Sequence, residues 1–218
     1  MKPGLSRHDI IAAYRDSHRM HGDSPAAVQW PKGRQDLRFR ALTRQIDPSR
    51  PCSVLDFGCG LAHLNDYFDQ HGFHVDYTGA DIVPEFVDAV AARHPGARVL
   101  LLDDSAALTE RYDHVVASGT FNIVEGDPAS HAATVRETLV RLFGACRSSL
   151  AVNFMTDDVD FVQEGAYHVA PDDVLSFVRQ TMTKRLLLDQ SYMPYEFTVV
   201  AFRDDAIVRP DNVYSPTN

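Results

Sequence analysis

The segment Cys52-Ser-Val-Leu-Asp-Phe-Gly-Cys-Gly-Leu-Ala62 decides the fold of this chain. It begins with an apolar run that is typical of a buried strand and passes through Asp56 into a turn that contains Gly58 and Gly60. Glycine tolerates unusual backbone angles and lets a ligand approach the main chain. A tight turn from a strand into a helix also leaves amide hydrogens free to bind a ligand. The segment therefore predicts a nucleotide-cofactor site.

The spacing of this turn argues against a pyrophosphate group. In the dinucleotide fingerprint G-x-G-x-x-G/A, a small residue follows the second glycine by three positions. His63 occupies that position here, and the small residue is Ala62 instead. Asp56 lies at the end of the strand, where a carboxylate would repel a pyrophosphate but suits the ammonium group of an amino-acid cofactor. We therefore expect a cofactor that carries an ammonium group.

A second acidic residue follows at the spacing of nucleotide-binding βαβ units. Residues 75–81 are predicted as a second strand, after a crossover helix, and Asp81 ends this strand. An acid about 20 residues after the glycine turn reaches the ribose hydroxyls in such units. Further strands are predicted at 99–102, 112–118 and 150–155. In an open parallel sheet the ends of these strands line one crevice, in which ligands bind.

Together these features resemble the D-x-G-x-G loop of class I S-adenosylmethionine (SAM) dependent methyltransferases, of the bacterial small-molecule type. The resemblance runs from Pro51 to about Arg203, and the Asp56 loop and Asp81 carry most of it. It implies an α/β fold with a seven-stranded, mostly parallel sheet and an antiparallel last strand. Helices would cover both faces in a three-layer sandwich, and a helical cap would precede it.

The resemblance also implies residues that bind SAM and its product, S-adenosylhomocysteine (SAH). Asp56 would face the amino group of the methionine moiety, while Gly58 and Gly60 would let the backbone approach it. Asp81 would accept the ribose hydroxyls, and Ile82 would pack on the adenine.

The remaining cofactor positions follow the third and fourth strands. Asp103 or Asp104 would meet the adenine amino group, and the doubled acid leaves the choice open. Ser118 and Gly119 would border the methionine end. Ala62 departs from the family, which usually has a third glycine there, and narrows the loop slightly.

Composition and charge restrict the partners. The chain of 218 residues is 44% hydrophobic and 23% charged, which is ordinary for a globular protein. No apolar run approaches the roughly 20 residues that span a membrane, and the amino terminus lacks a signal-peptide layout, so we expect a cytoplasmic protein without a membrane partner. The net charge of −9 disfavours a nonspecific grip on nucleic acid. We therefore expect a small-molecule substrate; the sequence does not predict an oligomeric state.

Three parts follow one another along the chain. Residues 1–50 are predicted as a helical cap, with helices at about 10–20 and 32–45. Residues 51–205 form the predicted cofactor domain, which ends in strands at 185–189 and 196–202. Residues 206–218 contain two prolines and are predicted as a loose tail.

Several subclasses lack their motifs. DNA amino-methyltransferases carry an Asp/Asn-Pro-Pro-aromatic motif after the fourth strand, and this chain has Ser118-Gly-Thr-Phe121 there. Protein arginine methyltransferases use two glutamates, and Glu125 alone lies nearby. The three cysteines have no paired spacing, and the acidic cluster at 157–160 is typical of a solvated loop. We therefore expect no metal.

Transfer from SAM needs little further chemistry, because the methyl group is already activated. The protein must align a nucleophile and exclude water, and a base helps when the nucleophile is protonated. Histidine suits that role. His168, beside Tyr167, is our candidate because it follows the fifth strand, although a surface-loop histidine is the alternative. His63 is a weaker candidate.

Candidate substrate residues lie in the cap and around the crevice. They are Trp30, Arg38, Phe121, Asn122 and Tyr195. For the aromatic residues packing is the alternative, and for Arg38 a solvated helix position is the alternative.

The sequence thus predicts a methyltransferase that moves a methyl group from SAM to an oxygen or nitrogen of a small polar metabolite by in-line displacement. Two alternatives stay open. A NAD-dependent oxidoreductase would share the sheet, although His63 argues against it. A non-catalytic SAM-binding module would share the whole site.

Overall fold

The computed structural model describes residues 4–29, 34–102 and 109–203. These ranges contain helices α1 (Arg7–His21), α2 (Gln35–Thr43), α3 (His63–Gln70), α4 (Pro84–Arg93), α5 (Pro128–Ala145) and α6 (Pro171–Thr181). The strands are β1 (Cys52–Phe57), β2 (Val75–Asp81), β3 (Arg98–Leu101), β4 (Tyr112–Ala117), β5 (Cys146–Thr156), β6 (His168–Val169), β7 (Leu186–Asp189) and β8 (Glu196–Phe202).

One sheet holds all these strands, in the order β3-β2-β1-β4-β5-β8-β7, with β6 paired to β5. Neighbouring strands are parallel except β8, which runs antiparallel to both β5 and β7. The strand order reverses between β1 and β4, and ligands bind beyond the carboxyl ends at such a switch point. The predicted α/β sheet with an antiparallel last strand is confirmed.

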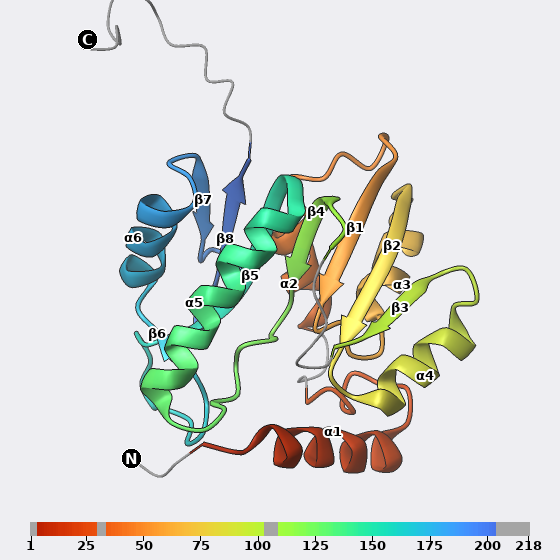
Figure 1. The fold of residues 1–218 in the computed structure, drawn as a ribbon, viewed down its shortest axis with the longest axis horizontal. Coiled ribbons are helices and arrows are strands. Elements are labelled where there is room, and N and C mark those ends of the chain that lie inside the picture. The colour runs from red at the N-terminus through yellow and green to blue at the C-terminus, as the bar shows by residue number, and fades with distance from the viewer. Residues whose placement is uncertain (1–3, 30–33, 103–108, 204–218) are drawn as a thin grey trace, which may run out of the picture.

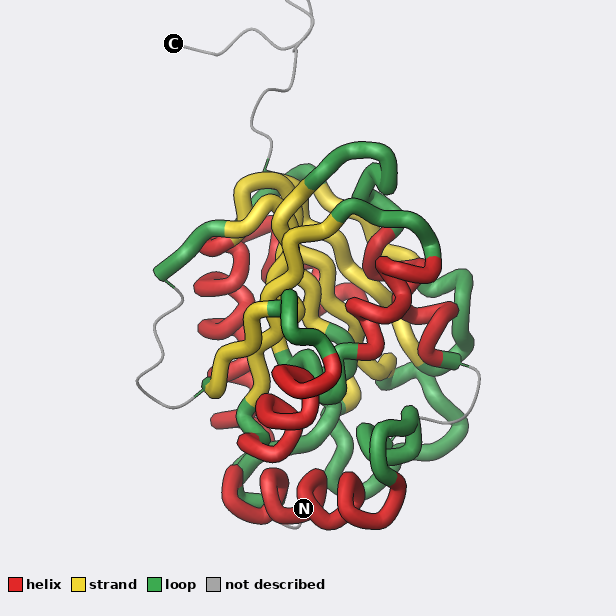
Figure 2. Tube along the Cα trace, turned by 90° about the vertical axis from the view of Figure 1, so that its right-hand side faces the viewer, coloured by secondary structure: helices red, strands yellow, loops and turns green. Residues whose placement is uncertain are grey.

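Helices form a layer on each face of the sheet (Figures 1 and 2). Helices α2, α3 and α4 bury Phe39, Leu64 and Val90 against one face. Helices α5 and α6 bury Leu139 and Val174, among others, against the other. Strand β1 contributes to both layers because it lies at the centre of the sheet, with Val54 on one side and Leu55 on the other.

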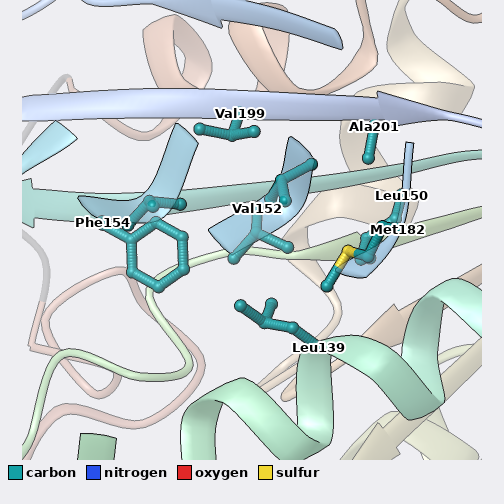
Figure 3. Close-up of a pocket in the computed structure, with 9 residues that line it drawn as sticks. Leu139, Leu150, Val152, Phe154, Met182, Val199 and Ala201 are labelled. Atoms are coloured by element: carbon teal, nitrogen blue, oxygen red, sulfur yellow. The ribbon is translucent and has the colours of Figure 1, made fainter. Parts of the chain in front are cut away.

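The core between the sheet and helices α5 and α6 is closely packed. Side chains from β5 and β8 meet Leu139 of α5 and Met182, which follows α6 (Figure 3). The space left between them is about 10 Å³ and has an entirely apolar lining. A space of this size holds at most one water molecule, and an apolar one stays dry. This pocket therefore belongs to the core and has no role in binding.

The first two helices take different places. Helix α1 lies across the carboxyl ends of the central strands (Figure 1). Ser6 caps it, because its hydroxyl accepts from the Asp9 amide at 3.1 Å. Tyr14 packs edge-on against Phe86 of α4, with ring centroids 5.9 Å apart. Helix α2 instead packs within the layer on the sheet face. The crevice is thus covered chiefly by α1 and the segment after it.

Most predicted elements appear within a few residues of their expected positions. Strand β5 is longer than the predicted 150–155, and the two-residue strand β6 was not predicted because two residues carry no periodicity. The first strand begins at Cys52 and the last ends at Phe202, inside the predicted core of 51–205. The tail predicted at 206–218 lies outside the described residues, as do Trp30, Asp103 and Asp104.

Candidate cofactor and acceptor site

The glycine loop is held against the end of β2. The amides of Gly58 and Cys59 both donate to the Ala80 carbonyl, at 2.7 and 3.1 Å. Gly58 and Gly60 have φ angles of 76° and 54°, a region that side chains rarely adopt. A Cβ atom at Gly58 would lie 2.5 Å from Oγ1 of Thr120, and one at Gly60 would lie 2.9 Å from Cγ1 of Val28. Both positions therefore require glycine.

Asp56 places a carboxylate beneath this loop. Its side chain is buried, and Oδ2 accepts a hydrogen bond from the Tyr77 hydroxyl at 2.8 Å. The other oxygen, Oδ1, is buried without a hydrogen-bond partner. Burial raises the pKa of Asp56 to about 7, the Tyr77 bond opposes this rise, and the charge of Asp81 adds to it. A cation placed beside this buried carboxyl group would stabilise its ionised form.

A small cavity of about 40 Å³ adjoins Asp56. Its lining includes Gly58 and Gly60 of the loop, Ser118 after β4 and Val28 of the segment after α1. Helix α3 begins at His63, which also lines the cavity, and its N-cap residue Ala62 supplies no side-chain cap. The first amides of a helix attract negative groups. A carboxylate that attracts cations and a helix start that attracts anions therefore both lie near this cavity.

Asp81 joins the glycine loop to the end of β2. One carboxylate oxygen accepts from the Gly60 amide at 2.8 Å, and the other accepts from the Val83 amide at 2.9 Å. Burial raises the pKa of Asp81, and these amides oppose the rise. Tyr14 of α1 lies close enough that burial and the Asp81 charge raise its pKa to about 12. Each oxygen keeps a lone pair for a further donor.

A larger cleft of about 780 Å³ lies on the α5 side of the loop. Ile82 after β2, Leu102 after β3 and Phe121 after β4 contribute to its lining. Phe121 is buried and stacks on Phe154 of the core, with ring centroids 6.1 Å apart. The lining of Ile82 and Leu102 suits a flat apolar ring.

His168 has one nitrogen committed and one free. Its Nδ1 lies 2.8 Å from the Thr156 carbonyl, and because a carbonyl only accepts, Nδ1 carries the hydrogen. The Nε2 atom is buried without a hydrogen-bond partner. Tyr167 points to the other face of the sheet, where it packs edge-on against His131, with ring centroids 4.9 Å apart. The structure therefore separates the two predicted catalytic residues.

The other predicted substrate residues have diverse surroundings. Arg38 is buried in an ion pair with Glu196. Tyr195 is 39% exposed and lies beside Phe161, at a ring-centroid distance of 6.3 Å. Asn122 has a buried Oδ1 atom without a partner. Its carbonyl accepts from the Tyr167 amide at 2.8 Å, which places it beside Tyr167.

The chain matches proteins of one family over most of its length. The family described as a methyltransferase domain matches residues 55–141. Rv1506c of Mycobacterium tuberculosis, which carries the name of a methyltransferase, is 32% identical over 160 residues, or 72% of this chain and 96% of that protein. The chain belongs to the methyltransferase family. It is therefore a SAM-dependent enzyme with the class I fold, and this finding decides against the oxidoreductase alternative.

Solved structures share the fold of this methyltransferase. The magnesium protoporphyrin IX methyltransferase of Synechocystis PCC 6803 with bound SAH has a TM-score of 0.62 and 16% identity, over 91% of this chain and 98% of that one. The 1,6-didemethyltoxoflavin-N1-methyltransferase of Burkholderia thailandensis, with its substrate and SAH bound, has a TM-score of 0.59 and 18% identity, over 91% and 87%. An O-methyltransferase family protein of the same organism has a TM-score of 0.66 and 12% identity, over 94% and 65%.

The residues of the methyltransferase fit SAM. The partnerless oxygen of Asp56 can accept from an ammonium group, and the uncapped start of α3 can bind a carboxylate. The cavity near them has room for only a few water molecules.

Sequence patterns missed two residues that shape the methyltransferase site. Tyr77 and Asn153 bond to the predicted site residues Asp56 and Gly119. Each lies in a strand with nothing local to mark it, so only the pairing register between strands could have identified it.

Two absences hold for the described residues: no helix combines the length and apolar character that crossing a bilayer requires, and no three His, Cys, Asp or Glu side chains cluster as metal ligands do.

Proposed function

We propose that this methyltransferase moves the methyl group of SAM to an oxygen or nitrogen atom of a small polar metabolite, with His168 as the base. The observation that carries the proposal is the buried Nε2 atom of His168, which has no partner while Nδ1 donates to the Thr156 carbonyl. This tautomer leaves a lone pair on Nε2. A buried lone pair of this kind is satisfied by an O–H or N–H group of an acceptor.

On the cofactor side, the chain's own groups would bind and orient SAM. Asp56 would accept from the ammonium group, Asp81 would accept from the ribose hydroxyls, and Ile82 would pack on the adenine. When bound, SAM supplies a methyl group on a positively charged sulfur, which makes the carbon an electrophile. Ser118 borders the cavity of Asp56 and so marks the side from which the acceptor approaches.

On the acceptor side, the base must take one proton. His168 Nε2 would take the proton of the acceptor's O–H or N–H, which would leave the acceptor atom nucleophilic toward the methyl group that bound SAM supplies. The Thr156 carbonyl, which holds the Nδ1 hydrogen at 2.8 Å, stabilises the imidazolium that forms. A carbon acceptor rarely carries a proton acidic enough for histidine, so oxygen and nitrogen are favoured.

Strand register supports an acceptor site next to His168. Met155 pairs with His168 on one side and with Glu196 on the other, and paired residues project from the same face of a sheet. Asn153 lies two positions before Met155 and shares that face. The face that carries His168 therefore presents polar groups near the carboxyl end of β5, which suits a polar substrate.

The names of two fold neighbours agree with the choice of oxygen or nitrogen as the acceptor atom. One neighbour is named as an N1-methyltransferase and another as an O-methyltransferase family protein. Both names describe transfer to a heteroatom, which is the chemistry that we propose here. The cytoplasmic location and the lack of a nucleic-acid partner stay predictions from composition.

Calorimetry with SAM and SAH is the first test, and we expect binding of both by the folded protein. Release of SAH on incubation with a fractionated metabolite pool should then identify an acceptor and exclude a purely binding role. Binding of neither compound would refute the proposal. Turnover only with an acceptor that lacks an O–H or N–H group would refute the choice of atom.

A further inference from the structure

A buried ion pair links helix α2 to the last strand of the sheet. Arg38 of α2 is 1% exposed, and its Nε donates to Oε2 of Glu196 at 2.7 Å. A second guanidinium nitrogen donates to Oε1, so the contact is bidentate. The Glu196 side chain is 13% exposed. A bidentate pair fixes the carboxylate in orientation as well as position.

Asn153 of β5 connects this pair to the loop after β4. Its Nδ2 donates to Oε2 of Glu196 at 3.1 Å, and its Oδ1 accepts from the Gly119 amide at 2.7 Å. Asn153 is completely buried. Because the carboxylate accepts and the amide donates, only one orientation of the Asn153 side chain satisfies both ends. Gly119 follows Ser118, which lines the Asp56 cavity.

We propose that Arg38, Glu196 and Asn153 form a positioning relay that sets the Ser118–Gly119 loop for the cofactor and the acceptor. This inference rests on the proposed function, and none of the three residues is assigned a contact with the reacting atoms. Arg38 orients Glu196, Glu196 orients the Asn153 amide, and that amide holds Gly119. Cofactor affinity therefore depends on Arg38 of α2, which acts on the loop after β4 through Glu196 of β8 and Asn153 of β5.

The location of the pair, rather than its stability, favours this role. Removing two charges from water costs about as much as a buried pair recovers, so such a pair is weak evidence for stability. Hydrogen bonds to charged groups do polarise their neighbours along a chain. The relay uses this effect to fix an amide next to the site.

A matched control exists on the same helix. Arg44 follows α2 and bonds to Asp189 of β7 at 2.6 Å. It ties the end of α2 to the same strand pair, β7 and β8, that holds Glu196, but its bond to Asp189 is not part of the chain from Glu196 through Asn153 to Gly119. Arg44→Gln therefore removes an ion pair of α2 and leaves the relay intact.

The test measures SAH affinity by calorimetry and thermal stability for Glu196→Gln, Asn153→Ala, the double variant and Arg44→Gln. We expect each relay variant to bind SAH about tenfold more weakly, the size of one lost hydrogen bond to a charged group. The double variant should lose no more than either single one, because both break one chain. Arg44→Gln should bind within about twofold of the wild type, because Arg44 is half exposed and its ion pair is not connected to the Ser118–Gly119 loop.

Three results would overturn the relay: a folded Glu196→Gln variant with wild-type affinity, additive losses in the double variant, or an equal loss in Arg44→Gln. If Glu196→Gln fails to fold, Arg38→Lys replaces it, since it keeps the cation but loses the bidentate contact, and affinity equal to wild type again contradicts the relay. Failure of the proposed function looks different, because the wild-type protein itself would then bind no SAH.

Discussion

The two halves of the crevice are built in different ways. The cofactor half comprises residues 56–82, and its side-chain bonds join residues that lie 21 positions apart, from Asp81 to Gly60 and from Tyr77 to Asp56. The acceptor half comprises Ser118, Asn153, His168 and Glu196, and its bonds span 34 and 43 positions, from Asn153 to Gly119 and to Glu196. Its bond to α2 spans 158 positions. The cofactor half is thus a local motif, whereas the acceptor half depends on strand register.

This contrast predicts that substitutions at Asp81 and at His168 affect different measurements, whereas Asn153 and Glu196 of the acceptor half act on SAH affinity through Gly119. Changes in the cofactor half should weaken the binding of SAH. Changes at His168 should slow transfer and leave SAH binding unaltered. The largest expected effect is therefore on the rate.

His168→Gln should lower the rate of SAH release with a metabolite acceptor by about a thousandfold, within the range that a positioned base contributes. The affinity for SAH should stay unchanged, because Nε2 is assigned to the acceptor. Steady-state kinetics and calorimetry on one preparation provide both values.

His114→Gln is the matched control for this substitution. His114 is also partly buried and bonds through Nδ1 to Ser149 at 2.8 Å, but it lies in the first half of β4, away from the crevice. We expect its rate to be close to that of the wild type. A His168 variant that transfers methyl groups as fast as this control would remove the base from the mechanism.

Asp81→Ala should weaken SAH binding by about a hundredfold, because the ribose hydroxyls lose an anionic acceptor and the Gly60 and Val83 amides lose their partner. Calorimetry measures the affinity, and thermal unfolding measures the cost to the fold. The SAH affinity of Asp81→Asn should fall between those of the wild type and the alanine variant, since one amide oxygen can replace only part of the carboxylate. Unchanged affinity in the alanine variant would reject the ribose assignment.

How far the sequence predicts the site follows the same division. Asp56, Gly58 and Gly60 are adjacent in the chain, and Asp81 follows at a set spacing, so a motif and a strand pattern place them all. Their predicted neighbours around β1 and β2 appear in the structure as a single loop-and-strand unit.

The contacts of the acceptor half could not be predicted from the sequence. Arg38 is predicted as a substrate residue from its place in the cap, yet its partner Glu196 lies in β8 and becomes a neighbour only when α2 packs on the sheet. Tyr167 and His168 are adjacent in sequence but project from opposite faces, because His168 begins β6 and successive side chains alternate along the extended chain there. A sequence pattern that misses a two-residue strand cannot assign those faces.

The pH dependence of cofactor binding tests the electrostatics of the cofactor half. The pKa of Asp56 is about 7 in the free protein, and an ammonium group beside it favours the ionised form. SAH affinity should therefore rise about tenfold between pH 6 and pH 8, as the ionised fraction of Asp56 increases. Calorimetry in buffers of different ionisation enthalpy should also detect a released proton at pH 6.

Asp56→Asn is the control for this dependence, and it should bind SAH weakly with little change over the same pH range. The stability of the ligand-free fold should change with pH in the opposite direction to the SAH affinity. A carboxyl whose pKa rises on folding, here from 3.8 to about 7, stabilises the fold less as pH increases between these values. Without ligand, the asparagine variant should therefore melt at a higher temperature than the wild type at pH 8. A wild-type affinity that does not vary with pH would place the ammonium group elsewhere.

The smallest expected effect concerns Ala62, where the family usually has glycine. Ala62 is fully buried with φ at 55° and ψ at 34°, in the left-handed region that costs an L-residue roughly 1–2 kcal/mol. Ala62→Gly relieves this cost, while it loses about 0.8 kcal/mol of methyl burial and gains unfolded-chain entropy worth about 0.4–1 kcal/mol. These terms nearly cancel, so the free energy of unfolding should change by less than about 1 kcal/mol.

Ala41→Gly provides the comparison, because Ala41 is buried in the middle of α2. Glycine there loses the same methyl group and costs about 1 kcal/mol of helix propensity, with no strain to relieve. Chemical denaturation should therefore rank Ala41→Gly as the more destabilising variant by at least about 1 kcal/mol. An equal loss in both variants would mean that the left-handed turn at Ala62 carries no strain, and that the cofactor half tolerates alanine there without cost.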